Sequence, residues 1–359
     1  MCPCSPLADP RPARRAAPVR CVALAPHFEG EATAADFEQK VREIKEIGAN
    51  LVLVVVQWGQ VDHTSDTLGP YQWGTDDAEV RTLIGQARAA GLDVLVFPIV
   101  KLARILPGRW RGTLAPRPPP LVGRLRGVHP ALRHPGRRGR RGLALGGQRA
   151  GHDGARRGRL APAHRPRARR FPGRLTYSAN WDHFHHVGFW DALDVIGLNA
   201  YHPVTARDGA TVLDLARSWR TIRRWLLAWH GWLPQPLLFT EVGYPSVEGG
   251  ARRPYHYGAD TAVDLAEQAR AYAAFIETWR DQPGVAGGCI WIWTGAGGAA
   301  TPATCPAASP PRRSSRPGSR GPERSALSDK RGCISAAASA RRSGAPPPGL
   351  RADRPPARR

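Results

Sequence analysis

The sequence predicts one (β/α)₈ barrel, the TIM-barrel fold class, in which the fourth strand region and the last helix are disrupted. Short apolar runs alternate with segments of helical periodicity, first in residues 19–103 and again in residues 174–295. This alternation is typical of a parallel sheet whose strands are joined by helical crossovers. Seven apolar runs are intact, and the segment between the two ordered regions has room for one more strand and two helices.

A doubly wound open sheet is the alternative, because it has the same alternation of strands and helices. That fold carries a Gly-rich phosphate loop directly after its first strand. In this chain Ala25-Pro26-His27-Phe28 follows the first apolar run instead. The barrel is therefore favoured.

The ordered region before residue 104 contains three predicted strands and two predicted helices. Each strand is a continuous apolar run, and each helix has apolar residues at three- and four-residue spacing. Thr33 is suited to open the first helix and Gly48 to close it. The strands are expected at residues 20–25, 51–56 and 92–100, and the helices at residues 33–48 and 76–90.

The ordered region after residue 173 continues the same pattern with four predicted strands and three predicted helices. The strands are expected at residues 174–179, 193–198, 236–241 and 285–292, and the helices at residues 184–190, 212–229 and 259–280. The third of these strands ends in a single carboxylate, Glu241, before a turn rich in Gly and Pro.

The formal net charge of +23 is distributed unevenly along the chain. Residues 104–173 hold 19 Arg and a single acid, Asp153, and residues 296–359 hold 13 basic and 3 acidic residues. Without these segments and the first 18 residues, the chain has a net charge of −7. We therefore expect a mildly acidic, Trp-rich globular protein and no nucleic-acid partner. Binding of a polyanion by the Arg-rich segments is a competing hypothesis, and it predicts a steep dependence on salt.

The composition also predicts the domain organisation. Residues 1–18 form an irregular N-terminal segment, and residues 19–298 form a single barrel that a basic Pro/Gly/Arg-rich segment interrupts at about 104–173. Residues 299–359 form a disordered basic low-complexity tail. The N-terminus lacks the apolar region of a signal peptide, and no apolar run is long enough to span a membrane. We expect no membrane partner, and the localisation, extracellular or cytoplasmic, stays open.

The segments at about 114–170 and 299–359 have neither helical nor strand periodicity. One explanation for the first segment is a disordered insertion, because such a composition buries too little apolar surface to fold alone. The other is a slip of the reading frame. Read one nucleotide later, suitable codons for residues 121–133 can encode an amphipathic helix, and those for 146–159 can encode Ser-Glu-Leu-Gly before a helix start. We interpret both segments as frameshifted, which leaves the barrel without a central strand and exposes two unpaired edges.

The cysteines do not indicate a metal site, because no pair has the CxxC spacing. Cys21 and Cys289 lie within predicted strands, and the other four cysteines lie in the irregular segments. We expect Cys21 and Cys289 to be buried free thiols rather than a disulfide, because cysteine is often a small core residue.

The candidate site follows from the barrel, whose strands all end at one mouth. Aromatic rings beside amide and carboxylate groups suit a carbohydrate, whose apolar faces stack on rings while its hydroxyl groups need hydrogen-bond partners. Each ring has the alternative of being a core residue, because successive residues of a strand face opposite sides. The substrate-binding candidates are Trp58, Asn180, Trp181, Asn199, Tyr201, Tyr244, Trp291 and Trp293.

Glu241 is the catalytic candidate. An acid at the end of a buried apolar strand is costly unless it is paired or functional. A structural salt bridge is the alternative. No second carboxylate of the segment at 104–173 is suitably placed, because Asp153 is its only acid and lies in a Gly/Arg run.

Three stretches give the sequence a resemblance to a known family: Phe239-Thr240-Glu241-Val242-Gly243-Tyr244-Pro245-Ser246, the Asp-Val-Ile-Gly-Leu-Asn-Ala-Tyr of residues 194–201, and Ile290-Trp291-Ile292-Trp293. They resemble the barrel of glycoside hydrolase family 113, the clan A β-mannanases. The resemblance covers the ordered regions. It implies a retaining endo-β-1,4-mannanase in which Glu241, on the seventh strand, is the nucleophile. The acid/base Glu of that clan ends the fourth strand, within the segment that we interpret as frameshifted, so its identity is unknown here.

We expect an oligosaccharide or polysaccharide substrate and a monomer. We expect neither a cofactor nor a metal, because no metal constellation is visible in the sequence and the chemistry requires none. Loss of the acid/base group predicts impaired activity, because general acid–base help contributes typically about 10²–10⁴-fold. Two alternatives stay open: a non-catalytic carbohydrate-binding barrel, and another clan A β-glucanase, whose turn after the catalytic Glu is similar.

Overall fold

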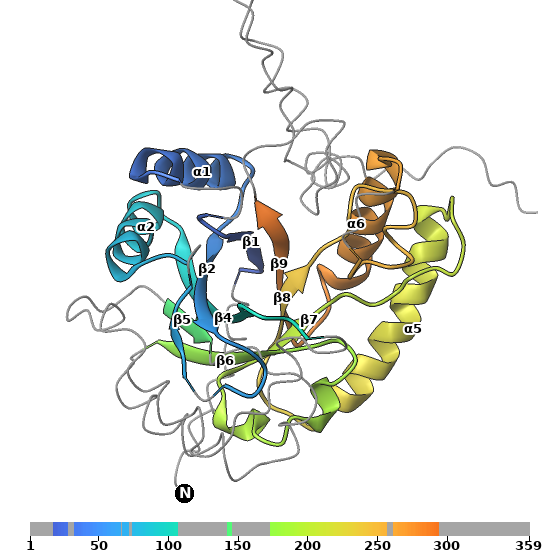
Figure 1. The fold of residues 1–359 in the computed structure, drawn as a ribbon. Helices are drawn as coiled ribbons and strands as arrows, with labels where there is room; N and C mark the ends of the chain where they lie inside the picture. The colour runs from blue at the N-terminus through green and yellow to red at the C-terminus, as the bar shows by residue number, and fades with distance from the viewer. Residues whose placement is uncertain are drawn as a thin grey trace, which may run out of the picture.

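The protein is described by a computed structural model over residues 17–27, 32–65, 67–71, 74–106, 142–145, 173–256 and 261–293. Eight parallel strands form a ring around one axis (Figure 1). Pairing runs from the first strand through all the others and returns to it, which closes the barrel. The strands are β1 (Val19–Leu24), β2 (Leu51–Gln60), β4 (Asp93–Leu102), β5 (Gly142–Leu145), β6 (Arg174–Ala179), β7 (Val195–Asn199), β8 (Leu237–Val242) and β9 (Val285–Trp293). The predicted barrel is thus confirmed.

One additional short strand, β3 (Gly69–Pro70), pairs antiparallel with the end of β2. The predicted strand at residues 51–56 therefore continues further than expected, because residues 57–60 pair with β4 and residues 58 and 59 also pair with β3.

Four α-helices of the described residues cover the outside of the ring. Helices α1 (Ala34–Glu46) and α2 (Asp77–Ala89) pack on one side of the barrel, and α5 (Val212–His230) and α6 (Leu265–Trp279) pack on another (Figure 1). Thr33 caps α1 as expected, in a reciprocal arrangement with Asp36. Such a cap satisfies backbone N–H groups that the first turn of a helix leaves without partners.

Two predicted helices differ from the structure. The helix expected at residues 259–280 begins only at Leu265, because the side chain of Asp264 caps it by accepting a hydrogen bond from the backbone of Glu267. The helix expected at residues 184–190 is instead two short 3₁₀ turns, η4 (Phe184–His186) and η5 (Trp190–Ala192).

The fourth position of the ring is occupied, contrary to the sequence prediction. Strand β5 pairs in parallel with β4 on one side and with β6 on the other. The expectation that the barrel lacks a central strand and exposes two edges is therefore wrong. Pairing of this kind uses main-chain groups, which every residue except Pro supplies in full. A four-residue segment without sequence periodicity can thus complete the ring.

Three hydrophobic clusters hold the barrel together. The interior cluster fills the ring with side chains of β1, β2, β4 and their partners, such as Ala23, Leu53 and Phe97. A second cluster lies between β1, β2, β4 and helices α1 and α2. The third lies between β6, β7, β8 and helices α5 and α6. Side chains at alternate positions of a strand therefore belong to different clusters, as the pleat requires.

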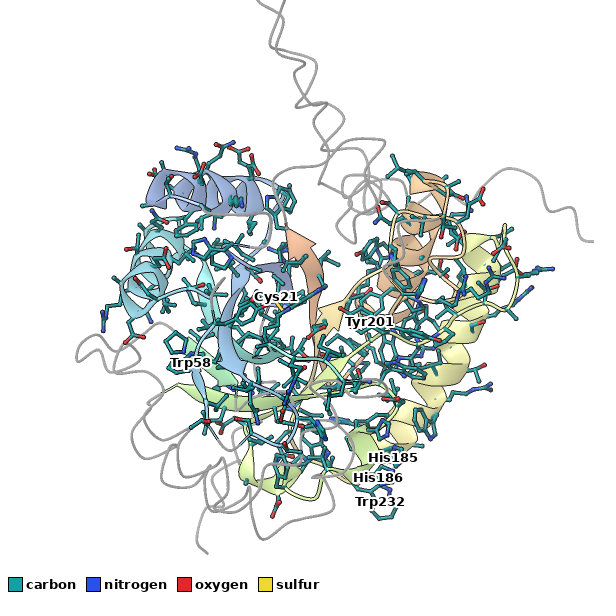
Figure 2. All side chains as sticks on the ribbon, in the orientation of Figure 1. Cys21, Trp58, His185, His186, Tyr201 and Trp232 are labelled. Carbon is teal, nitrogen blue, oxygen red and sulfur yellow. A yellow bond between two sulfur atoms is a disulfide. The ribbon has the colours of Figure 1, made fainter. Side chains whose placement is uncertain are left out.

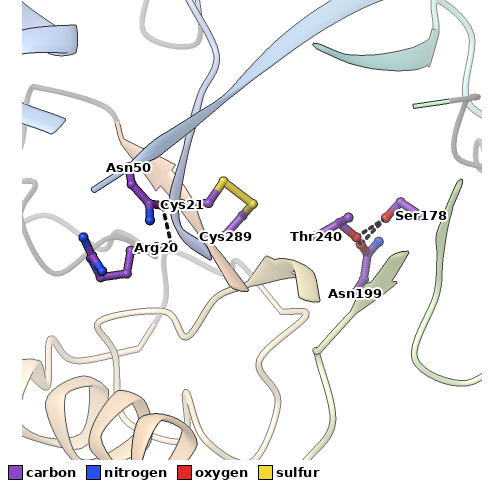
Figure 3. Close-up of a disulfide and its surroundings, with 7 residues drawn as sticks. All are labelled: Arg20, Cys21, Asn50, Ser178, Asn199, Thr240 and Cys289. Atoms are coloured by element: carbon purple, nitrogen blue, oxygen red, sulfur yellow. Dashed lines mark hydrogen bonds between the residues drawn. A yellow bond between two sulfur atoms is a disulfide. The ribbon is translucent and has the colours of Figure 1, made fainter. Parts of the chain in front are cut away.

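Cys21 of β1 and Cys289 of β9 form a disulfide inside the ring (Figure 3). The expectation of two free thiols is therefore wrong. The two residues are direct register partners on adjacent strands, and both side chains face the interior cluster. Since the pair is separated by 268 residues in sequence, its proximity follows from closure of the barrel and is not visible in the local sequence.

Predictions for residues 1–16, for the tail from residue 294, and for residues 107–141 and 146–172 lie outside the described residues. Within the described part, no helix is both long and apolar enough to cross a membrane. In the same part of the chain, no cluster of three His, Cys, Asp or Glu side chains is arranged to hold a metal ion.

Candidate active site

A β-bulge at the end of β8 directs Glu241 into the ring. Phe239 pairs with Gly288 of β9, but the next register pair is Val242 with Ile290, so β8 contains one extra residue. The same irregularity appears on the β7 side, where Asn199 is the partner of Glu241. Phe239 and Val242 belong to the third cluster, which lies outside the ring against helices α5 and α6. Thr240 and Glu241 lie between them, and both are buried polar residues. A bulge of this kind re-aims a side chain, and bulges are common beside active sites.

Tyr201 holds the carboxylate of Glu241. The Tyr201 hydroxyl donates a hydrogen bond of 2.8 Å to Oε2 of Glu241, and both residues are buried. Tyr201 follows β7 directly, and the backbone N–H of Ala200 donates to the carbonyl of Glu241. The end of β7 is therefore fixed to the end of β8 by main-chain and side-chain hydrogen bonds.

A layer of polar side chains lies on the neighbouring strands. The Ser178 hydroxyl of β6 contacts Oδ1 of Asn199 at 2.5 Å and the Thr240 hydroxyl at 2.6 Å, and Thr240 donates to the same Oδ1 at 3.1 Å (Figure 3). All three side chains are buried. Buried polar groups that are mutually hydrogen-bonded rigidify their surroundings. This network thus ties the three strands together next to Glu241.

Trp291 belongs to the same end of the barrel. Its ring lies 6.0 Å from that of Phe97, centroid to centroid, and packs against the interior cluster. A Cβ atom on Gly243 would lie 3.2 Å from the ring of Tyr201 and 3.5 Å from the Cβ of Trp291. Gly243 thus permits the close approach of these two aromatic residues, just after Glu241.

A second aromatic group surrounds His202, the residue after Tyr201. Trp181 lies against His202 with ring centroids 5.3 Å apart, and it stacks on Tyr255 at 6.2 Å with an interplanar angle of 12°. His202 is only 4% exposed, and its ring nitrogens have no hydrogen-bond partner among the described residues. Burial lowers the pKa of His202 to about 3, so the ring is neutral at ordinary pH.

Asn180 lies in the same turn as Trp181, after the end of β6. Its amide donates a hydrogen bond of 2.7 Å to Oδ1 of Asp182. The same carboxylate oxygen is 2.7 Å from Nδ1 of His183. Asn180 is half-buried, so the turn is fixed by these contacts at the edge of the candidate site.

Helix α6 fixes the loop that follows Glu241. Glu267 is buried and accepts hydrogen bonds from the backbone of Gly249 at 3.1 Å and of Ala251 at 2.8 Å. The side chain of Gln268 donates to the carbonyl of Tyr244 at 2.8 Å. This loop leads to Tyr255, so α6 indirectly positions the ring that stacks on Trp181.

Three of the predicted site residues lie away from this group. Trp58 packs against the cluster beneath α1 and α2, and Figure 2 shows it on the other side of the ring from Tyr201. Trp293 is buried in the same cluster, and its Nε1 donates to Glu43 of α1 at 2.9 Å. Tyr244 is fully buried in the third cluster, against helices α5 and α6, where its hydroxyl accepts a hydrogen bond of 3.0 Å from Trp219.

The reason for these three placements is the orientation of each side chain. In β9 a bulge between register partners Val22–Ile290 and Leu24–Trp293 changes the alternation, so Trp291 faces inward and Trp293 outward. Trp58 continues the alternation of β2, in which Val54 and Val56 face outward. Burial raises the pKa of the Tyr244 hydroxyl above its ordinary value, which fits a core residue. The structure therefore gathers Glu241, Asn199, Tyr201 and Trp291, with Trp181 and Asn180 beside them.

Sequence reasoning missed Ser178, Thr240, Glu267 and Tyr255. Ser178 and Thr240 lie on predicted strands, two and one residues before the predicted strand-end residues Asn180 and Glu241, and this spacing was the available signal. Glu267 lies in the first turn of α6, but the helix was expected to begin at residue 259, which placed Glu267 in its interior. Tyr255 lies in a loop without periodicity.

Comparison with known proteins supports a carbohydrate-active barrel. A model of Glycoside Hydrolase Family 113 matches residues 166–304, the part of the chain that contains Asn199, Tyr201, Glu241 and Trp291. The resemblance to this family that the sequence predicted is thus confirmed over that part. No curated protein matches the chain.

Solved structures show the same fold. The chain is similar to the GH113 β-mannanase AaManA from Alicyclobacillus acidocaldarius, solved in complex with ManMIm, with a TM-score of 0.63 and 22% identity over 77% of this chain and 87% of that one. A second GH113 β-1,4-mannanase has a TM-score of 0.63 and 20% identity over 77% of this chain and 89% of that one. A GH2 β-galacturonidase from Eisenbergiella tayi is similar with a TM-score of 0.51 and 13% identity, over 77% of this chain and 44% of that one. At these identities the likeness shows the barrel fold.

Proposed function

We propose that the chain is a retaining glycoside hydrolase of the β-mannanase type, in which Glu241 is the nucleophile and hydrolysis is impaired. The observation that carries this proposal is the buried carboxylate of Glu241, which a β8 bulge turns into the ring and which Tyr201 holds from the neighbouring strand. The family match over residues 166–304 supports the reaction class. The two similar β-mannanase structures favour β-1,4-mannan as the substrate.

The reaction is a double displacement. Glu241 attacks the anomeric carbon of the sugar, and the leaving oxygen departs as the covalent glycosyl-enzyme forms. Water then releases the sugar with retention of configuration. Tyr201 keeps the carboxylate in one orientation, while Trp291 and Trp181 offer rings on which sugar faces stack. Asn199 and Asn180 supply amide groups that can pair with sugar hydroxyl groups.

The position of the second carboxyl group explains the impairment. In a retaining site it lies about 5–5.5 Å from the nucleophile, protonates the leaving oxygen and later activates water. The resemblance places it at the end of the fourth strand, which is β5. The segment after β5 contains no Glu up to residue 173, and its single acid, Asp153, lies in a Gly/Arg run.

We further propose that residues 114–170 and 299–359 result from slips of the reading frame. The shifted reading supplies Ser-Glu-Leu-Gly for the segment after β5, which provides a carboxylate at the expected place. Resequencing the gene tests this directly. An uninterrupted frame that encodes residues 114–170 unchanged would rule out the slip.

The lack of a residue after β5 that matches the acid/base Glu also favours a second candidate function, a non-catalytic carbohydrate-binding barrel. This protein would bind manno-oligosaccharides at the same site without cleaving them. Another alternative is a β-glucanase of the same clan. It would use the same mechanism on a different substrate.

A polysaccharide panel separates these functions. The full chain and its Glu241→Gln variant are incubated with mannan, glucomannan, cellulose and a β-1,3-glucan, and binding and reducing ends are measured. We expect binding of mannan, slow cleavage of mannan by the full chain, and no cleavage by the variant. Binding without any cleavage supports the non-catalytic barrel, and preference for a glucan contradicts the mannan assignment. If Glu241→Gln cleaves mannan as fast as the full chain, Glu241 is not the nucleophile.

A further inference from the structure

Thr240 is the extra residue of the bulge at the end of β8. Between β7 and β8 the register partners advance from Leu198–Phe239 to Asn199–Glu241. Strand β8 therefore passes through one more residue than β7 over the same distance, and that residue is Thr240. In a bulge of this kind, two residues of one strand oppose a single residue of its partner.

The bulge decides which way Glu241 points. Successive side chains of a regular strand face opposite sides, and Phe239 faces the third cluster, outside the ring. Without an extra residue, Thr240 would face inward and Glu241 outward, into that apolar cluster, where an unpaired charge is costly. In the structure Val242 is instead the next residue to face the third cluster. The extra residue thus keeps the carboxylate on the inner side.

The hydroxyl of Thr240 is held by the two strands that precede β8 in the ring. It lies 2.6 Å from the hydroxyl of Ser178 on β6 and donates to Oδ1 of Asn199 on β7 at 3.1 Å (Figure 3). Ser178 contacts the same Oδ1 at 2.5 Å, so the three groups form a closed triangle. Thr240 is completely buried, so these contacts do not compete with solvent.

The methyl group of Thr240 lies over Gly197 of β7. A Cβ atom on Gly197 would be 3.0 Å from Cγ2 of Thr240, so the glycine leaves the space that this methyl group occupies. A β-branched side chain has few allowed rotamers. The methyl group therefore favours the rotamer in which the hydroxyl reaches Ser178 and Asn199.

Resting on the proposed function, in which Glu241 is the nucleophile, we infer that Thr240 is a positioning residue for Glu241. Its hydroxyl, held by Ser178 and Asn199, keeps the extra residue of β8 on the inner side of the ring. The carboxylate thereby stays within reach of the Tyr201 hydroxyl. Because Thr240 acts through the orientation of the carboxylate, its loss should slow the first chemical step more than it weakens saccharide binding.

Two substitutions separate the hydroxyl of Thr240 from its methyl group. Thr240→Val keeps the shape and the methyl group over Gly197 but removes the hydroxyl, whereas Thr240→Ser keeps the hydroxyl and removes the methyl group. Stopped-flow release of phenolate from a dinitrophenyl β-mannoside measures the first step, and calorimetry measures binding of manno-oligosaccharide. We expect Thr240→Val to slow release by about tenfold or more, the kinetic equivalent of its lost buried hydrogen bonds, and to weaken binding by less than about threefold. Thr240→Ser should release phenolate within about threefold of the native rate.

Thr278→Val is the matched control. Thr278 is also a buried threonine, but its hydroxyl donates to the carbonyl of Ala274 at 2.8 Å within helix α6. This variant should release phenolate at the native rate. If Thr240→Val does not fold, Ser178→Ala tests the same contact from β6 and should slow release without a change in β8. Native release by a folded Ser178→Ala would then overturn the inference.

Hydrogen exchange at Ala200 reports the bulge without any reaction. The amide of Ala200 donates to the carbonyl of Glu241 at 2.7 Å, so its protection depends on the register between β7 and β8. It should exchange faster in Thr240→Val than in the native chain or in Thr240→Ser.

The outcomes separate the positioning role of Thr240 from the proposed function. Native release by Thr240→Val, or release by Thr240→Ser that is as slow as in Thr240→Val, overturns the positioning role and leaves the proposed function standing. If the native chain releases no phenolate, the proposed function fails and exchange at Ala200 decides alone. Equal exchange in the native chain and in Thr240→Val then overturns the role of Thr240 as well.

Discussion

Glu241 at the end of β8 and Tyr201 after β7 are joined by a hydrogen bond between neighbouring strands. The hydroxyl of Tyr201 reaches Oε2 of Glu241 because the extra residue in β8 turns the carboxylate inward. A hydrogen bond to a charged group contributes about 1.5–3 kcal/mol. Its loss should therefore be visible in the reaction of Glu241 and much less in the overall fold.

The variant Tyr201→Phe tests this contact. We expect the rate of phenolate release from a dinitrophenyl β-mannoside, whose leaving group needs no acid, to fall by about 10- to 100-fold, which is the kinetic equivalent of that hydrogen bond. Binding of manno-oligosaccharide should change by less. Stopped-flow measurement of phenolate release and calorimetric measurement of binding separate the two effects. An unchanged rate of release would show that the hydroxyl does not act on the nucleophile.

His202 gives the protein a defined response to acid. Its pKa is about 3 in the folded protein and 6.5 when exposed, so the unfolded chain binds the extra proton in the range between these values. The contribution of neutral His202 to the free energy of unfolding is therefore complete above pH 6.5, and it is lost as the pH falls toward 3. The nearby charge of Asp182 favours protonation, but burial against Trp181 and Trp219 outweighs it.

We therefore expect His202 to make the protein about 2 kcal/mol less stable at pH 5 than at pH 7.5. Urea unfolding at both values measures this difference. In His202→Phe, which keeps a planar ring without titratable nitrogens, the loss between the two pH values should be smaller by that amount. Equal losses in both proteins would show that His202 titrates normally. The comparison uses differences within each protein, so a general change in stability does not affect it.

Single residues also show how far sequence reasoning reached. Glu241 was predicted because an acid ends an apolar run, and Asn199 and Tyr201 because they share one face of a strand. Trp293 and Trp58 could not be assigned in this way. A bulge in β9 reverses the facing of its last residue, and a bulge depends on pairing that the local sequence does not reveal.

At the scale of elements, helix α6 positions the loop that follows the nucleophile. The buried carboxylate of Glu267 satisfies the N–H groups of Gly249 and Ala251, which lie in a tight turn away from solvent. Buried backbone donors that lose their partner cost about 1–3 kcal/mol. The loop also carries Tyr255 to its stacking position on Trp181.

Glu267→Ala should accordingly lower the free energy of unfolding by about 1–3 kcal/mol and weaken saccharide binding. Glu277→Ala is the matched control on the same helix, because Glu277 is exposed and only pairs with Arg220 at 3.8 Å. Its effect should stay below about 1 kcal/mol, as for surface ion pairs. Chemical unfolding and calorimetry measure both. Equal effects of the two variants would contradict a special role of Glu267.

Elements were predicted well where periodicity is strong. The helices at α1, α2 and α5 were expected within a few residues, and the caps of α1 follow from Thr33. The start of α6 was placed too early because Ala259 to Val263 continue an apolar pattern, whereas Asp264 sets the true beginning. Capping side chains thus decided the boundary that periodicity left open.

At the scale of the whole molecule, the barrel is closed twice over. Strands β1 and β9 are joined by backbone pairing and by the disulfide between Cys21 and Cys289. A bond that connects residues so far apart in sequence restricts the unfolded chain strongly, and disulfides typically contribute about 2–4 kcal/mol. Strand β9 also pairs with β8 on its other edge, which places Trp291 next to the end of β8.

Reduction should therefore destabilise the protein. We expect dithiothreitol to lower the free energy of unfolding of the native chain by about 2–4 kcal/mol. The double variant Cys21→Ser/Cys289→Ser should be less stable from the start and should not respond to the reductant. Guanidinium unfolding under both conditions measures this. A native chain that is indifferent to reductant would contradict a stabilising disulfide.

The global fold was predictable because the strand and helix pattern repeats over two long regions. The fourth strand was not, because β5 is short and lies in a Gly/Arg-rich segment whose sequence has no strand period. The disulfide was not predictable either, because only ring closure makes its two cysteines neighbours. Both features arise from the arrangement of the whole chain.

The nucleophilic role of Glu241 is tested most directly by trapping the covalent intermediate. A fluorosugar inactivator, with fluorine at the second carbon of a β-mannosyl fluoride, forms the glycosyl ester but hydrolyses slowly. Its leaving group requires no acid, so the missing acid/base group does not interfere. We predict that peptide mass spectrometry finds one fluoromannosyl group, on Glu241, and none in Glu241→Gln. A label on another residue, or no label on a protein that binds manno-oligosaccharides, would contradict this role.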